Sequence, residues 1–346
     1  MDLSRLVTRA RRARRSLFFG TGCAVVAGGL TASLALSEGS AAAAAKQAKI
    51  AYMSYAVANP YDAPMLAQAK AVAKAEGATL TVFDANNSPS TQLNQLQTVI
   101  SSGKYNGIIT QPINSLNLIT AVESAIGKGI KVVNMDQALG PKLSTPDPQV
   151  KGLSGSVMKV VVTEGHALGT LAVDACKAKH LNPCNIGFVG NSPGSTYDKA
   201  RDQGFNAAIK ADHNIKIVDT VYGGFTVAQN LQAIQPMLQA HPYPQINLIA
   251  GSDQSIEGAQ QVPVDKRVVL VGDGGSSTGI KMTKSGAWFG TVFEAPATEG
   301  KLAAQCVIAA VRTGKKCGGI NPILKYPNSG IITRANVSKF KAQWIG

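Results

Sequence analysis

A serine with the spacing of a nucleophile stands in the segment GNSPG at residues 190–194. This Gly-x-Ser-x-Gly pattern is typical of a sharp strand-to-helix turn in hydrolases, and the apolar run at 185–190 supplies the strand. The residue after the serine should donate a backbone N–H to the oxyanion hole, but Pro193 has none. No histidine follows residue 241, so the last third of the chain offers no general base. The sequence therefore favours a glycine-rich turn at the end of a strand over a serine hydrolase.

Motifs for cofactors and metals are also missing from the sequence. In the glycine-rich run at 272–279, Ser277 stands where a dinucleotide fingerprint needs its third glycine, and no P-loop pattern occurs. The cysteines and the four histidines lack the spacing of zinc ligands. We therefore expect no cofactor, no metal and no enzymatic activity.

A different set of side chains gathers at the ends of the expected strands, and its chemistry suits hydroxyl groups. The set contains Asp136, Asp273, Glu294, Asn59, Gln137, Arg201, Tyr61 and Phe225. Carboxylates and amides accept hydrogen bonds from hydroxyls, a guanidinium donates them, and aromatic rings pack on the C–H faces of sugars. An anionic ligand would need several cations, and Arg201 is the one that stands out. The sequence thus favours a sugar or polyol as ligand.

The elements that position these residues alternate between strand and helix patterns. Four apolar strand-like runs alternate with three helical patterns over residues 49–136, and a break rich in Pro, Gly and Ser follows at 137–156. The alternation resumes at 161 and continues to 314. This order predicts an α/β fold of two doubly wound, Rossmann-like lobes with parallel sheets. In such sheets ligands bind outside the carboxyl ends of the strands, which is where the set lies.

Residues 1–45 predict an export signal peptide. Six arginines lie within residues 5–15, an uncharged apolar run covers 17–36, and small residues at 41–45 offer cleavage sites. The paired arginines partly fit the twin-arginine route, and the general secretory route stays open. An uncleaved membrane anchor is the other interpretation of the apolar run. We expect an exported protein, either periplasmic or at the cell surface.

The charge and the cysteines of the rest of the chain fit an exported protein. The formal charge of +14 falls to about +10 without residues 1–45, and the remaining basic residues are mostly single lysines. This pattern disfavours nucleic-acid binding. Four cysteines follow the signal: Cys176, Cys184, Cys306 and Cys317. An oxidising compartment favours two local disulfides between sequence neighbours, although the sequence leaves other connectivities open.

From about Lys49 to the last strands the chain resembles the periplasmic ribose-binding-like proteins of sugar ABC transporters. The motifs that carry the resemblance are NPYDAP, NMDQA, ARDQGF, YGGFT, GSD, GDGG and TVFEAP. The resemblance implies ligand contacts from Asn59, Tyr61, Asp62, Asp136, Gln137, Arg201, Phe225, Ser252, Asp273 and Glu294. Gln137, Ser252 and the shifted Asp273 depart from the ribose-type pattern, so ribose is not the expected ligand, and a different pentose, a hexose, a polyol or another small hydroxylated compound stays open.

The resemblance also implies a mechanism and a division of the chain. Three crossing strands, expected near 152–156, 293–296 and 318–330, would join lobes that close on the ligand like a hinge. The expected first lobe comprises 46–154 plus 295–320, and the second comprises 155–294 plus 321–346. The implied function is a monomeric solute-binding protein that delivers its ligand to an ABC permease. A ligand sensor that feeds a chemoreceptor or sensor kinase is the alternative that the sequence leaves open.

Overall fold

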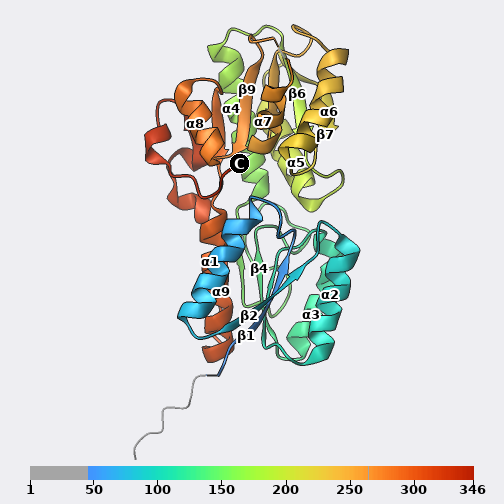
Figure 1. Ribbon diagram of the computed structural model, residues 1–346, viewed down its shortest axis with the longest axis vertical. Helices are drawn as coiled ribbons and strands as arrows, with labels where there is room; N and C mark the ends of the chain where they lie inside the picture. Colours follow the sequence, from blue (N-terminus) through green and yellow to red (C-terminus); the bar gives the residue numbers. More distant parts are fainter. Residues whose placement is uncertain (1–45, 264) are drawn as a thin grey trace, which may run out of the picture. The chain divides into compact units, whose positions relative to one another are not determined.

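The computed structural model describes residues 46–263 and 265–346, which form two α/β lobes (Figure 1). The α/β class and the two parallel-sheet lobes predicted from the sequence are confirmed. The expected export signal, residues 1–45, lies outside the described residues. Among the helices that are described, none has the length and apolar character needed to cross a bilayer.

The first lobe is built on a six-stranded parallel sheet. Its strands are β1 (Lys49–Ser54), β2 (Thr79–Asp84), β3 (Gly107–Thr110), β4 (Lys131–Met135), β5 (Gly155–Val157) and β11 (Gly318–Ile320). They lie in the order β11-β5-β4-β3-β1-β2. The central strands β1 and β3 are buried except for Lys49, and mostly apolar, because helices cover both faces of the sheet.

Four helices cover the first sheet, two on each face (Figure 1). They are α1 (Asp62–Ala75) and α9 (Pro296–Thr313) on one face, and α2 (Pro89–Ser102) and α3 (Ser115–Gly127) on the other. Local signals set their ends: Ser88 caps α2 by accepting the N–H of Thr91, and Gly103 ends it at φ 63°.

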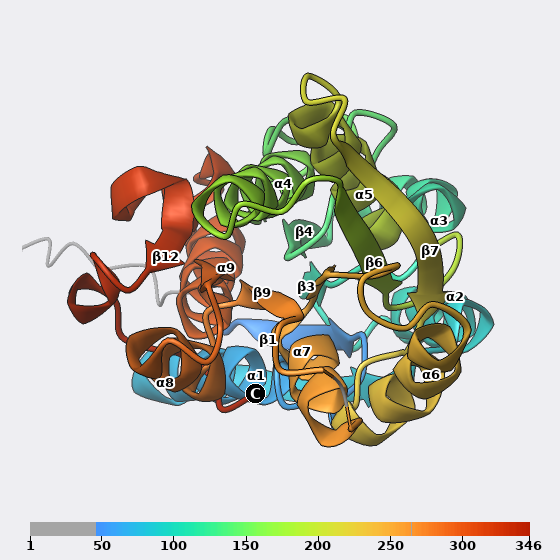
Figure 2. The same cartoon turned by 90° about the horizontal axis from the view of Figure 1, so that it is seen from above.

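The second lobe repeats this plan with one antiparallel edge strand. Its strands are β6 (Cys184–Gly190), β7 (Ile215–Tyr222), β8 (Leu248–Gly251), β9 (Val269–Gly274), β10 (Gly290–Phe293) and β12 (Ile331–Thr333). Their order is β12-β10-β9-β8-β6-β7, and β12 runs antiparallel to β10. Seen from above, α4 (Val161–Ala178) and α5 (Thr196–Ile209) lie on one side of this sheet, and α6 (Val227–Ala240), α7 (Asp253–Gln261) and α8 (Ser277–Ser285) lie on the other (Figure 2).

Helix α8 was not predicted from the sequence. Its residues STGIKMTKS are mostly polar, so the apolar periodicity of a core-facing helix is weak. Caps fix the helix instead: Ser276 accepts the N–H of Gly279 at the start, and Gly286 at φ 86° ends it.

Helices α4 and α5 pack unusually close together because two glycines face the partner backbone. A Cβ on Gly165 would lie 2.1 Å from the carbonyl oxygen of Arg201, and one on Gly204 would lie 2.0 Å from that of Val162. Such distances exclude any side chain without a shift of the backbone. This approach holds the Arg201 end of α5 deep in the second lobe.

Three segments cross between the lobes. The first runs from β5 to α4, the second from β10 to α9, and the third from β11 to β12 through the 3₁₀ turns η1 (Pro322–Lys325) and η2 (Pro327–Gly330). A last turn, η3 (Val337–Lys339), follows β12. The lobe bounds predicted from the sequence stay a prediction, but β5 pairs with β4 and β11. Residues 155–157 therefore belong to the first sheet, three positions beyond the predicted division at 154, because they continue its hydrogen-bond ladder.

Both local cysteine pairs lie at disulfide distance. The Cα–Cα distances are 5.8 Å for Cys176–Cys184 and 6.0 Å for Cys306–Cys317. The first pair joins the last turn of α4 to the start of β6, and the second joins α9 to the residue before β11. The predicted pairing between sequence neighbours is confirmed.

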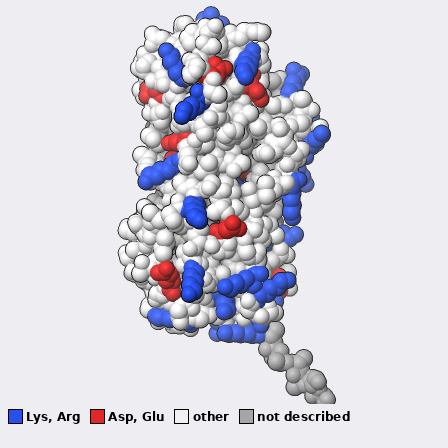
Figure 3. Space-filling view, turned by 180° about the vertical axis from the view of Figure 1, so that it is seen from behind, with Lys and Arg blue, Asp and Glu red and all other residues white. Residues whose placement is uncertain are grey.

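On the face shown in Figure 3, Lys and Arg side chains stand singly or in small groups, with Asp and Glu side chains between them. They are denser toward the far end of the first lobe. Such scattered charge is typical of a solvated surface.

Candidate ligand-binding cleft

The carboxyl ends of both sheets face a common cleft with a cavity volume of about 50 Å³. Its lining contains Tyr55, Asn59, Tyr61, Asp62, Gln111, Asp136, Gln137, Lys159, Asn191, Tyr197, Phe225, Ser252, Gln254, Asp273, Glu294 and Trp344. All the ligand contacts predicted from the sequence are in this set except Arg201. The structure thus brings those side chains together, and their binding of a ligand stays a prediction.

A carboxylate pair bridged by an amide forms the first-lobe wall of the cleft. The Gln111 side chain donates from Nε2 to Asp62 Oδ1 at 2.7 Å and to Asp136 Oδ2 at 3.0 Å. Asp136 follows β4 with φ 67°, a left-handed conformation that is costly outside glycine and recurs at functional sites. Burial, and then the nearby Asp136 charge, raise the pKa of Asp62 to about 8.

Lys159, on the crossing segment between β5 and α4, provides the positive charge of the cleft lining. Its ammonium donates to Tyr61 Oη at 2.7 Å and to Glu294 Oε2 at 2.5 Å. It also lies 3.4 Å from Asp136 Oδ1 and 3.6 Å from Glu164 Oε2. The sequence prediction missed Lys159 because it lies beyond the strand-end loops. Its one signal is a single cation in the otherwise uncharged run 152–163.

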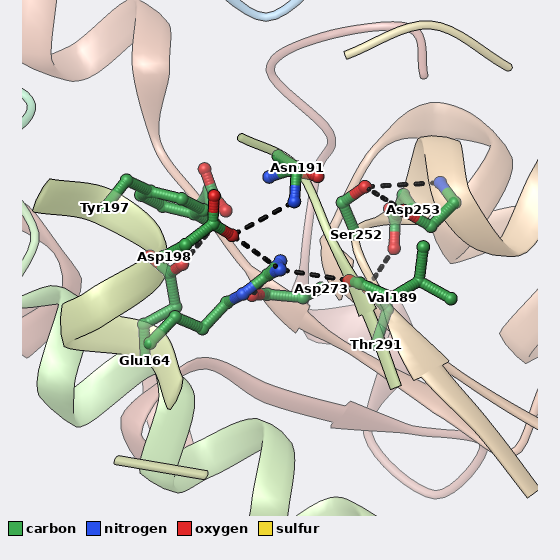
Figure 4. A network of polar contacts seen from close by, with 12 residues as sticks. Glu164, Val189, Asn191, Tyr197, Asp198, Ser252, Asp253, Asp273 and Thr291 are labelled. Carbon is green, nitrogen blue, oxygen red and sulfur yellow. Dashed lines mark hydrogen bonds and ion pairs between the residues drawn. The ribbon is translucent and has the colours of Figure 1, made fainter. Parts of the chain in front are cut away.

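Arg201 lies behind the cleft and does not line it, which corrects the sequence prediction of its place. Its guanidinium contacts the Val189 carbonyl and the carboxyl groups of Asp198 and Asp273, all three of which are labelled in Figure 4. Arg201 Nη2 donates to the Val189 carbonyl at 3.0 Å and to Asp198 Oδ1 at 3.2 Å, while Nη1 lies 4.0 Å from Asp273 Oδ2. The close packing of α4 and α5 keeps Arg201 fully buried, so it supports Asp273 from behind.

Asp273 presents unsatisfied acceptors to the cleft. Its side chain is buried, and both carboxylate oxygens lack a hydrogen-bond partner among the described residues. Burial, followed by repulsion from Glu164 and Glu294, raises the pKa of Asp273 well above its ordinary value. A buried carboxyl without partners is costly, and ligand donors at this position would remove the cost.

Oxygens of Glu164, Asp273 and Glu294 lie within 4.8 Å of one another, a spacing that also suits a metal ion. The ammonium of Lys159, however, is already 2.5 Å from Glu294 and 3.6 Å from Glu164. This ammonium supplies the positive charge that a cation would otherwise bring, so the arrangement favours a structural ion pair over a metal centre.

Aromatic side chains from the two lobes meet across the cleft. The rings of Tyr55 and Phe225 contact edge to face with centroids 5.6 Å apart, and those of Tyr61 and Trp344 do so at 5.5 Å. The Trp344 indole also donates to the Gly274 carbonyl at 2.8 Å, which fixes the ring beside the end of β9. These rings offer flat apolar faces to a bound molecule.

The GNSPG turn at 190–194 has a structural role. The backbone N–H groups of Asn191 and Ser192 donate to the Asp198 carboxylate at 3.0 and 2.6 Å, and the Ser195 side chain caps α5. Asp198 therefore closes the turn onto the helix, and Asn191 is left to line the cleft. The expectation of a strand-end turn agrees with this arrangement.

Some lining residues were missed by the sequence prediction. Tyr55, Gln111, Asn191 and Tyr197 belong to strand-end loops or to the helix start that follows one, so their position was a usable signal. Gln254 lies in the first turn of α7, one step beyond such a loop. Trp344 lies after the last strand, β12, and does not belong to a strand-end loop, so the position of the strands gave no reason to expect it at a ligand.

Comparisons with known proteins agree with this architecture. The family model of the periplasmic binding protein domain matches residues 50–316. The D-allose-binding periplasmic protein of Escherichia coli K12 is 26% identical over 295 residues, which cover 82% of this chain and 90% of that protein. The ribose import binding protein of Bacillus subtilis 168 is 24% identical over 249 residues, 71% of this chain and 76% of that protein.

Solved structures share the fold. A solute binding protein of an ABC transporter from Mycobacterium smegmatis, solved with bound glycerol, has a TM-score of 0.71 at 24% identity and covers 87% of this chain and 99% of its own. A galactofuranose binding protein has a TM-score of 0.72 at 17% identity, covering 84% and 96%. The resemblance predicted from the sequence is confirmed. The chain belongs to the family of periplasmic binding proteins, which bind solutes without acting as enzymes.

Proposed function

We propose that this protein is the extracytoplasmic solute-binding component of an ABC importer and that it binds a sugar or related polyol in the cleft between its lobes. The observation that carries the proposal is Asp273, whose two unpartnered oxygens face a cleft walled by aromatic rings. A sugar or polyol brings both hydroxyl donors for the carboxylate and C–H faces for the rings.

The ligand would contact both lobes. Asn59, Asp62 and Asp136 offer polar groups from the first lobe, and Ser252 and Asp273 offer them from the second. A molecule that hydrogen-bonds to both walls binds the closed arrangement more tightly than an open one, so it shifts the protein toward closure. The closed form would then dock on a membrane permease as a monomer.

The names of related proteins support this class of ligand. The relatives include proteins that bind D-allose and ribose and a xylitol-binding protein from Mycolicibacterium smegmatis. Export to the periplasm or cell surface follows for this chain from the signal expected in residues 1–45. A ligand-sensing role that feeds a chemoreceptor or sensor kinase uses the same cleft and is the alternative.

Calorimetric titration of the purified protein with a panel of uncharged sugars and polyols tests the proposal. The panel contains D-ribose, D-allose, D-glucose, xylitol, myo-inositol and glycerol. We expect one-to-one binding of at least one member and recovery of that member chemically unchanged. Absence of heat and of thermal stabilisation with every member would refute a carbohydrate ligand. Transport and sensing are then separated by whether the liganded protein stimulates the ATPase of a reconstituted importer.

A further inference from the structure

Lys159 is a buried lysine surrounded by carboxyl groups in the lining of the cleft, and sugar binding alone does not explain why it is there. The side chain is 3% exposed, and it starts from the segment that crosses from β5 to α4. Its ammonium donates to Tyr61 and Glu294 and has Asp136 and Glu164 as further neighbours. An ammonium has three N–H donors: two of them bond Tyr61 and Glu294, and the third has the Asp136 and Glu164 carboxyl groups at 3.4 and 3.6 Å as its nearest acidic neighbours.

The surroundings of Lys159 are strongly acidic. Besides Asp136, Glu164 and Glu294, the buried Glu299 accepts the Lys159 backbone N–H at 2.9 Å. The phenols of Tyr61 and Tyr197 face the ammonium, with ring centroids 4.4 and 5.3 Å from Nζ. Burial disfavours the charged ammonium, but Glu164, Glu294, Asp136 and Glu299 outweigh it and hold the pKa of Lys159 well above its ordinary value.

The positive charge in the cleft lining is therefore supplied by a side chain of the protein itself, Lys159. Lys159 is the positively charged residue of the lining, because Arg201 is fully buried behind Asp273 and pairs with Asp198. Among the described lining residues a ligand meets Asp273 oxygens without a hydrogen-bond partner, whereas Lys159 is paired; Arg201 Nε and Nη1 also lack hydrogen-bond partners, but Arg201 is fully buried and does not line the cleft. A carboxylate or phosphate on the ligand would thus be repelled, and an ammonium on the ligand would have to compete with Lys159 for the same oxygens.

Resting on the proposed function, we propose that Lys159 is the residue that makes the cleft selective for uncharged polyhydroxylated ligands. Its ammonium occupies the place between Glu294, Asp136 and Glu164 that the amino group of a ligand would take. Removal of the Lys159 charge would leave these carboxyl groups without a neighbouring positive charge. The affinity for ligands that carry an amino group should then rise relative to that for uncharged ligands. Removal of the Glu294 charge would instead release Lys159 for an acidic ligand.

Matched ligands with one changed group test this proposal by calorimetry. The triplets are D-glucose, D-glucosamine and D-glucuronate, and glycerol, 2-amino-1,3-propanediol and glycerate. For the unmodified protein we expect the uncharged member to bind at least tenfold more tightly than the other two. In Lys159→Met the affinity of the amino member relative to the uncharged one should rise at least tenfold. Lys159→Arg keeps the charge but not the shape of the ammonium, so it should raise this ratio less than Lys159→Met does.

Two controls keep the test decisive. Each comparison is a ratio of affinities within one variant, so a reduced folded fraction lowers both values alike. Lys301→Met, an exposed lysine on α9, should change no ratio. If Lys159→Met does not fold, Glu294→Gln gives the second test: the affinity for the acidic member relative to the uncharged one should rise at least tenfold.

The outcomes distinguish this proposal from the proposed function. Binding of an uncharged member with unchanged ratios in Lys159→Met and Glu294→Gln would overturn the role of Lys159 and leave the sugar-binding function standing. Tighter binding of the amino or acidic member by the unmodified protein would also overturn it. No binding by any uncharged compound, including the larger panel, would overturn the proposed function itself.

Discussion

Lys159 and Glu294, whose side chains lie 2.5 Å apart, join two of the segments that cross between the lobes. Lys159 precedes α4 on the first crossing, and Glu294 follows β10 on the second. Tyr61 from the first lobe accepts a further hydrogen bond from the same ammonium at 2.7 Å. The ion pair thus connects two crossing segments with residues that line the cleft. A ligand that alters the contacts of Lys159 would therefore also alter the contact between these crossings.

The free energy of unfolding should fall as the pH rises from about 4 to about 8. In the folded protein the pKa of Asp62 is raised to about 8, whereas the unfolded chain loses this proton near pH 4. The folded state therefore holds more protons than the unfolded chain in this pH range. The contribution of protonated Asp62 to the unfolding free energy is lost as the pH rises through its pKa in the folded protein, about 8. Glu164, with its pKa raised to about 7, adds to the same trend.

Urea denaturation at pH 5 and at pH 8.5 measures this trend. Asp62→Asn should reduce the difference in unfolding free energy between the two pH values by on the order of 1–3 kcal/mol. Asp174→Asn, an exposed aspartate on α4, should leave it unchanged. An equal difference in Asp62→Asn and the unmodified protein would contradict the assignment.

Arg201→Ala should weaken both folding and ligand binding. The change leaves Asp198 and Asp273 buried without their cation, which costs about 3 kcal/mol or more of stability. Arg201→Lys keeps the charge but lacks the planar fork, so an intermediate effect is expected. Thermal unfolding and calorimetry measure the two effects, and a variant with unchanged affinity would show that Arg201 does not support Asp273.

Trp344 should report ligand binding through its fluorescence. The chain has two tryptophans, and Trp288 is buried in the core of the second lobe. In a Trp288→Phe protein the emission comes from Trp344, and a ligand beside Tyr61 should change its intensity or wavelength. Trp344→Ala should reduce affinity about tenfold by removing an apolar face. Emission that stays constant at saturating ligand would place the bound molecule away from Trp344.

Reduction of the disulfides should destabilise the protein without abolishing the cleft. The Cys306–Cys317 bridge closes a separation of 11 residues, which predicts a loss of about 2–3 kcal/mol of unfolding free energy in the double serine variant. The bridge joins α9 to the residue before β11, and neither cysteine lines the cleft, so ligand affinity should change less than threefold. Denaturation with and without reductant checks the first value, and titration checks the second.

The alternation of strand and helix patterns predicted much of the fold, and the expectation that ligands bind at the carboxyl ends of the strands predicted part of the cleft. Asp136 follows β4 and Asp273 is the next-to-last residue of β9, so the topology of the two parallel sheets brings them to facing edges. Arg201 was placed too close to the ligand because the depth of α5 depends on the glycine contacts between α4 and α5, which no single-sequence pattern reveals.

Lys159 and Trp344 mark the limit of that reasoning. Lys159 lies on a crossing with no periodicity, and its role depends on carboxylates that are distant in sequence, such as Glu294. Trp344 reaches the cleft because the third crossing returns the chain to the second lobe beside Gly274. Both placements arise from tertiary packing of segments whose local sequence carries no strand or helix signal.

Titration of Asp273→Asn beside the unmodified protein tests the central claim most directly. The change keeps the shape of the side chain but replaces one of its oxygens, a hydrogen-bond acceptor, by an NH₂ donor. The account predicts one-to-one binding of an uncharged sugar or polyol by the unmodified protein and at least tenfold weaker binding by the variant. Affinity that is equal in the two proteins, with both folded, would contradict a hydroxyl-binding cleft centred on this carboxylate.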